Sequence, residues 1–186
     1  MKKITANTAH EIAQRFKLQE ESQALLTEKQ TPEEYLQLMT KHKHYHDAVT
    51  FLAHGLPARE AVWWSSVCAR YHYDACASND QVALVTAETW VRHPEECNRR
   101  LAEKHAEAGD YATPASWAAA AAFWSGGSIS AEGDPVMEPP PYLYAHAVAG
   151  AIIMAAGFKT PAVNIVEQRY QTYVEHGSNI ANGGTG

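Results

Sequence analysis

The feature that most constrains the fold of this chain is the regular spacing of helix start and stop signals along it. Thr31-Pro32-Glu33-Glu34 combines a capping Thr, a Pro at the first helical position and a Glu three residues after the cap. Thr113-Pro114 and Thr160-Pro161 repeat the Thr-Pro start. Helical runs are followed by glycines, whose left-handed conformation would end a helix at little cost. These glycines are Gly55, Gly109, Gly126, Gly157 and Gly177.

The segments between these signals predict helices with short connections, and short connections favour antiparallel neighbours. The predicted helices span residues 6–16, 32–42, 45–54, 58–75, 79–92, 95–108, 114–124, 141–156 and 161–176. No strand-like alternation with hairpin turn residues competes with this interpretation. We therefore expect an all-α fold, a compact bundle of about eight or nine helices built from antiparallel αα-hairpins.

The same signals predict how the chain is divided. Residues 1–30 are expected to form an N-terminal helix and a polar linker, in which 18–30 is either a linker or an irregular helix. Residues 31–177 are expected to form the helical domain, and 178–186 a flexible C-terminal tail. The helix predicted at 58–75 is apolar nearly all round, which places it at the centre of the domain. Runs of small residues at 118–122 and 145–151 predict that the two helices carrying them pack closely together.

Charge and hydropathy exclude several classes of partner. The net charge is −6, and the longest basic run is only Lys41-His42-Lys43-His44, so neither nucleic acid nor an anionic membrane surface is an expected partner. The most apolar stretch, 143–158, is shorter than the ~20 residues that a membrane span needs. The residues after Met1-Lys2-Lys3 contain no apolar core typical of a secretion signal. We expect a cytoplasmic protein without membrane insertion.

The sequence contains no pattern that predicts catalysis or metal binding. His42 and His46 would share one face of a continuous helix, but no Glu base lies between them, and a solvated helix end is the preferred interpretation. Cys68, Cys76 and Cys97 form no CxxC pair. No GxSxG serine elbow is present. The chain is therefore predicted to have no catalytic residues, no metal and no cofactor, and not to be an enzyme.

Adjacent tryptophans at the start of the 58–75 helix suggest a binding surface. Trp63 and Trp64 point about 100° apart on a helix, so one is expected in the core, and the other could line a groove or stack on Arg59. Arg59 and Glu60 open this helix and Arg70 lies near its end. The alternative role for these charges is in structural ion pairs that complement the helix dipole.

A second candidate is the loop Ser125-Gly126-Gly127-Ser128, which follows a helix ending in Phe123-Trp124. Its backbone amides could bind an anion, or the loop could serve only as a helix stop. The predicted protein-binding residues are Arg59, Glu60, Trp63, Arg70, Trp124, Ser125, Gly126 and Gly127. The alternative is a small helical enzyme or ligand-binding domain that uses the Ser125–Ser128 loop and the nearby tryptophans.

Two stretches also carry a family resemblance. Residues 56–70, which include Ala61-Val62-Trp63-Trp64, and residues 121–128, followed by Pro139-Pro140, resemble the signature of an uncharacterised bacterial protein family. Members of that family are often encoded in type VI secretion gene clusters, and the resemblance covers roughly residues 45–183. It implies a non-enzymatic cytosolic accessory role, as an adaptor or chaperone that binds a protein partner such as a secretion effector or spike component. It supplies no catalytic residues.

Overall fold

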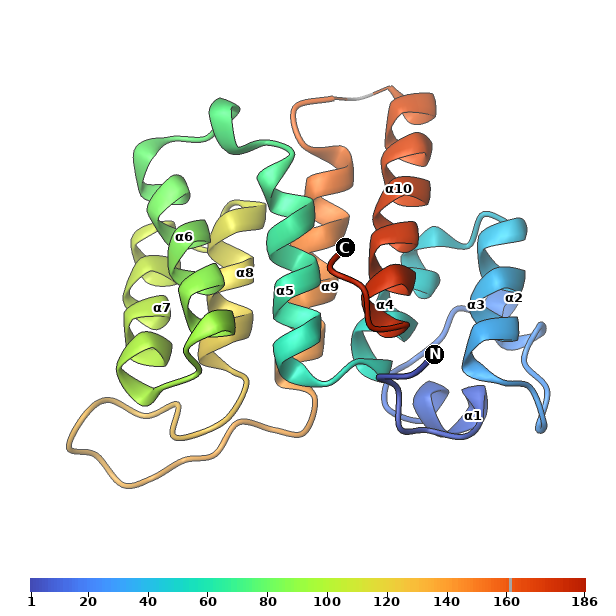
Figure 1. The fold of residues 1–186 in the computed structure, drawn as a ribbon, viewed down its shortest axis with the longest axis horizontal. Coiled ribbons are helices and arrows are strands. Elements are labelled where there is room, and N and C mark those ends of the chain that lie inside the picture. Colours follow the sequence, from blue (N-terminus) through green and yellow to red (C-terminus); the bar gives the residue numbers. More distant parts are fainter. Residues whose placement is uncertain (161) are drawn as a thin grey trace. The chain divides into compact units, whose positions relative to one another are not determined.

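The computed structural model describes residues 1–160 and 162–186, and within them the chain is all-helical with no strand, which confirms the predicted fold class. The ten α-helices described are α1 (Ala9–Ala13), α2 (Glu20–Gln23), α3 (Pro32–Lys41), α4 (Tyr45–Gly55), α5 (Ala58–Arg70), α6 (Ser78–Arg92), α7 (Glu96–Ala108), α8 (Pro114–Phe123), α9 (Leu143–Gly157) and α10 (Val163–Ala181). A single 3-10 turn, Tyr73–Ala75, follows α5 (Figure 1).

The chain divides into two compact units. Unit 1 comprises residues 1–57 and 156–186, and unit 2 comprises residues 58–155. This division differs from the expected boundaries at residues 30 and 177. The predicted stop at Gly177 is wrong, because Gly177 is buried inside α10 and the helix continues to Ala181. Ile180 and Ala181 are buried, and the Lys3 amide donates to the Ala181 carbonyl at 2.8 Å.

Unit 1 is built around α3 and α4. The predicted cap of α3 is confirmed: the Thr31 hydroxyl accepts from the Glu34 amide while the Glu34 carboxylate accepts from the Thr31 amide. These hydrogen bonds hold the pKa of Glu34 below its usual value. Tyr35 of α3 meets Phe51 of α4 edge to face in the core, at 5.1 Å between ring centroids. The polar segment 18–30 holds the short helix α2, and the helix predicted at 6–16 is reduced to α1.

The histidines of unit 1 do not lie on one continuous helix. Between α3 and α4 the backbone turns at Lys43, whose φ is 62°. His42 follows the end of α3, whereas His44 precedes the first residue of α4 and lies with Nδ1 3.1 Å from the Ser22 hydroxyl. The helical spacing that would place His42 and His46 on one face is therefore absent. Among the described residues, no three His, Cys, Asp or Glu side chains are grouped to hold a metal ion.

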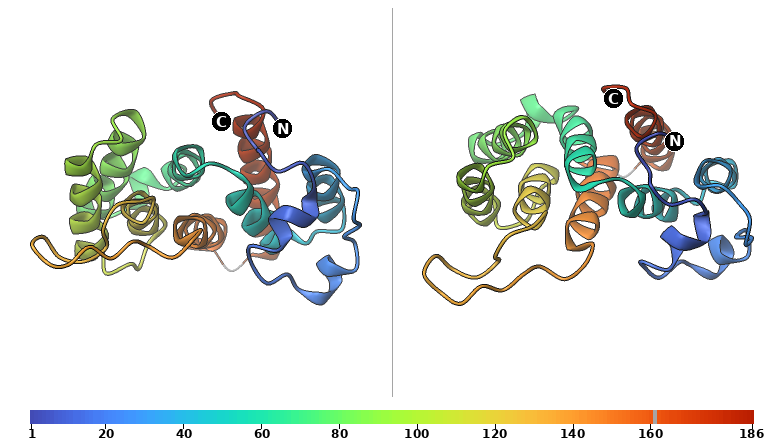
Figure 2. Two further views of the ribbon diagram at one scale, coloured as in Figure 1. Left: turned by 90° about the horizontal axis from the view of Figure 1, so that it is seen from below. Right: turned by 60° about the horizontal axis from the view of Figure 1, so that its bottom comes forward.

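Unit 2 contains α5 to α8 and most of α9, which run alternately up and down (Figure 1). Helix α8 packs against α5, α6 and α7, and an end-on view shows it among these neighbours (Figure 2). Every residue of α8 except Trp117 is buried. Such a helix has no wet face and is rich in alanine because its neighbours approach from several sides.

Helix α5 is also largely buried, as its sequence predicts. Trp64 and Cys68 are fully buried, whereas Val67 is half-buried, and burial raises the pKa of the Cys68 thiol well above its usual value. The close packing expected between the two alanine-rich helices is visible at Gly150 of α9, where an added Cβ would lie 3.5 Å from the Trp117 ring of α8. Gly150 thus leaves room for this indole.

The glycines that were predicted to end helices do not adopt the left-handed backbone conformation expected of them. Among the glycines in the described part of the chain, positive φ occurs at Gly127, Gly133, Gly183 and Gly186, and not at the five glycines expected to adopt it. The predicted start of the last helix at Pro161 lies outside the described residues. No helix within them is both long enough and apolar enough to span a bilayer.

Candidate functional site: an anchored loop

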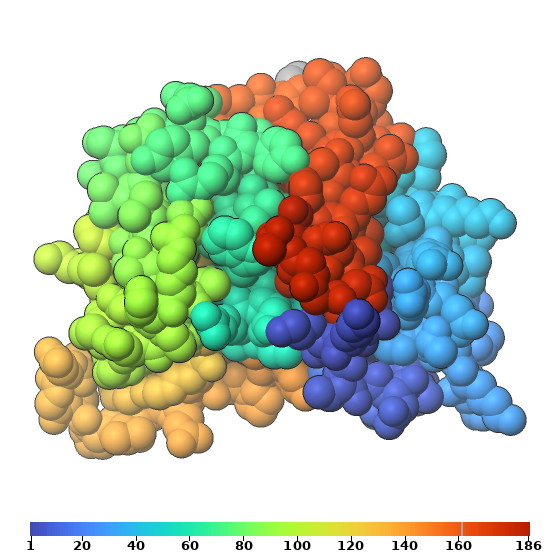
Figure 3. Space-filling view, in the orientation of Figure 1, coloured from blue at the N-terminus to red at the C-terminus, as the bar shows by residue number. Residues whose placement is uncertain are grey.

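The most exposed apolar residues of unit 2 lie in the loop between α8 and α9, residues 124–142, called here the α8–α9 loop. Val136 is 79% exposed and Met137 is 60% exposed. The loop forms a ridge along the lower edge of the space-filling view, below α6 and α7 (Figure 3). Loops of this length without secondary structure are uncommon in compact domains, and many of them are functional. The α8–α9 loop is therefore the first candidate for a binding site.

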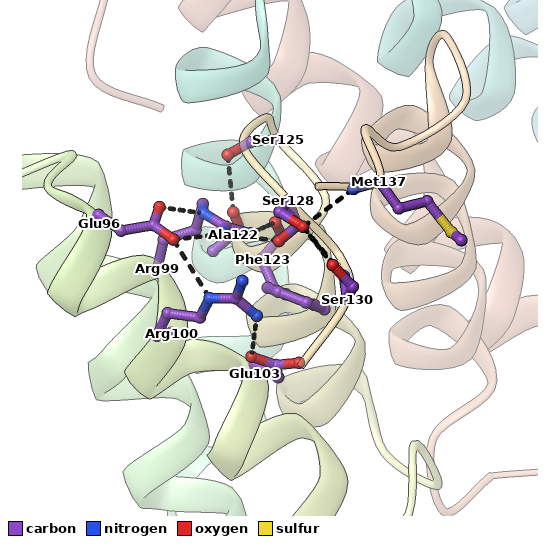
Figure 4. Close-up of polar contacts among 10 residues, drawn as sticks. All are labelled: Glu96, Arg99, Arg100, Glu103, Ala122, Phe123, Ser125, Ser128, Ser130 and Met137. Atoms are coloured by element: carbon purple, nitrogen blue, oxygen red, sulfur yellow. Dashed lines mark hydrogen bonds and ion pairs between the residues drawn. The ribbon is translucent and has the colours of Figure 1, made fainter. Parts of the chain in front are cut away.

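A buried arginine of α7 anchors the start of this loop. Arg99 Nη1 donates to the Phe123 carbonyl at 2.7 Å, and Nη2 donates to the Ser128 carbonyl at 2.8 Å (Figure 4). The guanidinium carbon also lies 4.9 Å from the centre of the Phe123 ring. Arg99 thus joins the last residue of α8 to the fifth residue of the loop, and holds the intervening turn against α7.

The charge of Arg99 is balanced within its own helix. Arg99 Nε and Nη2 each donate to one oxygen of Glu96 at 2.6 Å, a bidentate pair one turn apart. This pairing, joined by Arg100, holds the pKa of Glu96 below its usual value. Arg100 bridges Glu96 and Glu103, and its hydrogen bond to Glu103 raises the pKa of Arg100. The four side chains form one network at the start of α7 (Figure 4).

Gly127 is the residue that lets the loop backbone pass over this guanidinium. Its φ is +66°, which a side-chain-bearing residue rarely adopts, and a Cβ built there would lie 3.0 Å from Arg99 Cζ. Glycine is needed at this position both for its backbone conformation and for the close approach to Arg99.

Ser128 connects the anchored start of the loop to its exposed part through hydrogen bonds. Its hydroxyl accepts from the Met137 amide at 3.1 Å and from the Ser130 amide at 3.2 Å. The Ile129 amide donates to the Met137 carbonyl at 2.8 Å, and the Ser130 hydroxyl donates to the Pro135 carbonyl at 2.6 Å. A continuous series of hydrogen bonds therefore runs from Arg99 to the residues that present Val136 and Met137 (Figure 4).

Three half-buried aromatic rings contact one another in unit 2: Tyr111, Trp117 of α8, and Trp124, the first residue of the α8–α9 loop. The Tyr111 and Trp124 rings stack with centroids 6.2 Å apart, and Trp117 meets Trp124 at 6.1 Å and Tyr111 at 6.3 Å, both edge to face. Tyr111 has a φ of 51°, an uncommon conformation for an aromatic residue. Burial raises the pKa of Tyr111, and Glu107 and Glu103 add to the effect.

The model of a family of unknown function, DUF6931, matches residues 35–181. The chain belongs to DUF6931. No curated protein and no solved structure matches it. The DUF6931 match includes all of unit 2, and therefore both the Arg99 network and the α8–α9 loop.

In this DUF6931 protein the predicted binding residues lie at two separate ends of unit 2. Helix α5 begins at the same end at which α8 finishes, so Arg59, Glu60 and the start of the loop share that end (Figure 1). Arg59 is exposed and its Nε donates to the Val91 carbonyl in the last turn of α6 at 2.6 Å. Glu60 and Trp63 are half-buried.

Arg70 does not join this group. It is the last residue of α5, at the opposite end of the helix, and it forms a bidentate pair with Glu88 of α6. Its role matches the alternative interpretation, a structural ion pair. The predicted set of charged binding residues is therefore divided between the two ends of α5.

The predicted loop residues fall at the anchored turn rather than at the exposed ridge. Trp124, Ser125 and Gly126 are half-buried, Gly127 is exposed, and the Ser125 hydroxyl donates to the Ala122 carbonyl at 2.7 Å. Sequence reasoning missed Arg99, Glu96, Val136 and Met137. In the sequence, Glu96 and Arg99 at i, i+3 look like an ordinary surface ion pair, so nothing indicates that Arg99 is buried. The apolar pair Val136-Met137 between prolines was a usable signal for an exposed apolar site.

Proposed function

We propose that this DUF6931 protein is a non-enzymatic accessory protein, an adaptor or chaperone-like module, which binds a protein partner through the α8–α9 loop. The observation that carries the proposal is the exposure of Val136 and Met137 on a loop whose backbone is hydrogen-bonded to Arg99 and to the Ser128 hydroxyl. Exposed apolar side chains grouped on a ridge are typical of protein-binding surfaces, and methionine adapts readily to a partner. A preordered loop loses less conformational entropy on binding.

The serine hydroxyls of the loop favour this role over the alternative of an enzyme or ligand-binding domain. The hydroxyls of Ser125, Ser128 and Ser130 all take part in the hydrogen bonds that shape the loop itself. A small molecule that accepted a hydrogen bond from any of these hydroxyls would have to break one of these bonds. Display of the ridge to another protein leaves them intact.

The cellular setting of the proposal comes from the sequence resemblance. We place the protein in the bacterial cytoplasm as an accessory of a type VI secretion system, with an effector or spike component as partner. The net charge of −6 agrees with a protein partner rather than a nucleic acid.

The test is affinity purification from the native organism followed by mass spectrometry. The test variant is Val136→Gln/Met137→Gln, which removes exposed apolar surface without touching the anchor. The matched control is Val82→Gln/Val85→Gln, which removes exposed apolar surface from α6. We expect the loop variant to lose a partner that the wild type and the α6 variant retain. Equal recovery of the same partners by all three proteins would show that the loop is not the binding site.

A further inference from the structure

The outer part of the α8–α9 loop has the composition of a proline-type ligand. Residues 135–141 read Pro-Val-Met-Glu-Pro-Pro-Pro, and within this stretch all but Pro139 are exposed. Each proline holds its own φ near −65° and keeps the preceding residue extended. Consecutive prolines therefore favour the polyproline II conformation, which needs no internal hydrogen bonds.

The hydrogen bonds of residues 135–141 show which of their backbone groups are already occupied and could not pair with a partner strand. The Pro135 carbonyl and both backbone groups of Met137 are bonded to residues 128–130, and the Pro140 carbonyl accepts from the Leu143 amide at 3.1 Å where the segment turns into α9. The prolines have no N–H with which to add a strand to a partner sheet. Recognition by side-chain packing in a groove, as polyproline segments are bound, fits the segment better than strand addition.

The charge around the segment limits the kind of partner. Glu132, Asp134 and Glu138 are exposed, and residues 124–142 contain no Lys or Arg. A complementary surface would carry positive charge beside its groove. A second copy of this chain is disfavoured, because each copy has a net charge of −6.

We propose that residues 135–141 are a polyproline-type ligand for a basic partner protein that has an aromatic-lined groove. This inference rests on the proposed function and adds the chemistry of the partner. The prolines and Val136 fill the groove, and the three carboxylates around them face basic side chains at its rim.

The test begins with the full chain carrying a photoreactive benzoylphenylalanine at position 136, expressed in the native organism. The cross-linked protein is identified, purified and titrated with the unmodified chain at low and high salt. We expect a basic protein whose affinity falls roughly tenfold between 50 and 300 mM NaCl, because rim charges are screened. Glu132→Gln/Asp134→Asn/Glu138→Gln should weaken binding by a similar factor.

Two further variants separate charge from conformation. Pro139→Ala/Pro140→Ala should weaken binding about 4- to 30-fold. Each alanine leaves the unbound loop with more backbone freedom than the proline does, and ordering that residue on binding then costs about 0.4–1 kcal/mol more. The control Glu21→Gln/Glu28→Gln/Glu175→Gln removes the same charge from exposed positions of unit 1 and should bind within about twofold of wild type.

The outcomes distinguish this inference from the proposed function. Suppose that a partner cross-links at position 136, but that its affinity does not change with salt, with the loop charges or with the proline substitutions. This result would overturn the inference and leave the proposed function standing. An acidic partner, or a second copy of this chain, would also overturn the inference. If no protein cross-links and the Val136→Gln/Met137→Gln variant retains every partner, both proposals fail.

Discussion

Unit 2 contains two bidentate arginine–glutamate pairs of the same length and opposite burial. In the α7 pair the cation is buried: the Arg99 side chain is 5% exposed and Glu96 is 61% exposed. In the α5–α6 pair the anion is buried: the Glu88 side chain is 7% exposed and Arg70 is 43% exposed. Both pairs have N–O distances of 2.6 Å.

The difference lies in what the buried member does with its remaining hydrogen-bonding groups. A guanidinium has five N–H donors, so Arg99 can satisfy Glu96 and still hold the Phe123 and Ser128 carbonyls. Glu88 has only acceptors, which Arg70 and, at 3.9 Å, Arg92 engage. A buried arginine can thus organise a loop, whereas a buried glutamate ties two helices together.

The largest effect is expected for Arg99→Met. The substitution leaves two backbone carbonyls without donors, at about 1–3 kcal/mol each, and we expect a loss of about 3–5 kcal/mol in the free energy of unfolding. Denaturant titration measures this loss, and hydrogen exchange of residues 127–137 should accelerate. The control Arg100→Met removes a more exposed arginine of the same network and should cost less than about 1 kcal/mol. Equal losses in the two variants would refute the anchoring role.

Arg70→Met is expected to have the next largest effect, of about 2–3 kcal/mol. It leaves the buried Glu88 carboxylate with only the distant Arg92, and an uncompensated buried charge is destabilising. Hydrogen exchange in the α8–α9 loop should stay at the wild-type rate, because this pair does not contact the loop. Faster loop exchange in this variant would show that the two pairs do not have separate roles.

Gly127→Ala tests the passage of the loop over Arg99. An alanine must adopt a φ of +66° and place its Cβ 3.0 Å from the guanidinium, so we expect a loss of about 1–2 kcal/mol. Gly133→Ala is the control, since Gly133 also has positive φ but no neighbouring atom within 4 Å of an added Cβ. The difference between the two variants in thermal unfolding isolates the contact with Arg99. If Gly133→Ala is equally destabilising, the loss in Gly127→Ala comes from backbone strain alone and not from the contact with Arg99.

The smallest effect is the pH dependence of the Glu96 pair. Arg99 lowers the pKa of Glu96 from its ordinary 4.5, so the pair contributes stability above that pH. This contribution is lost as pH falls below 4.5 through the lowered pKa. Between pH 6 and pH 3 the wild type should lose more stability than Glu96→Gln, with a small difference because Glu96 is exposed. Parallel stability curves for the two proteins would contradict the assignment.

Local signals predicted most helices well, because caps and prolines act within one turn. Thr31 and Thr113 cap their helices through neighbours three residues away, as their sequence context indicates. The prediction failed where packing outweighs local preference. Gly177 reads as a stop, but burial within unit 1 keeps it inside α10. By contrast, the break predicted between the helices at 32–42 and 45–54 is confirmed, since the backbone turns at Lys43 and separates His42 from His46.

The sequence by itself determined that this chain is helical, where most of its helices begin, and that a Gly-Gly turn follows α8. Only the tertiary structure decided that Arg99 would be buried and that Arg70 would lie at the surface. In sequence both are arginines with a glutamate available as a partner. The bond from Arg99 to Ser128 joins residues 29 positions apart, and such a contact exists only after α7 and α8 have packed. Local preferences act over three or four residues and carry no information about that distance.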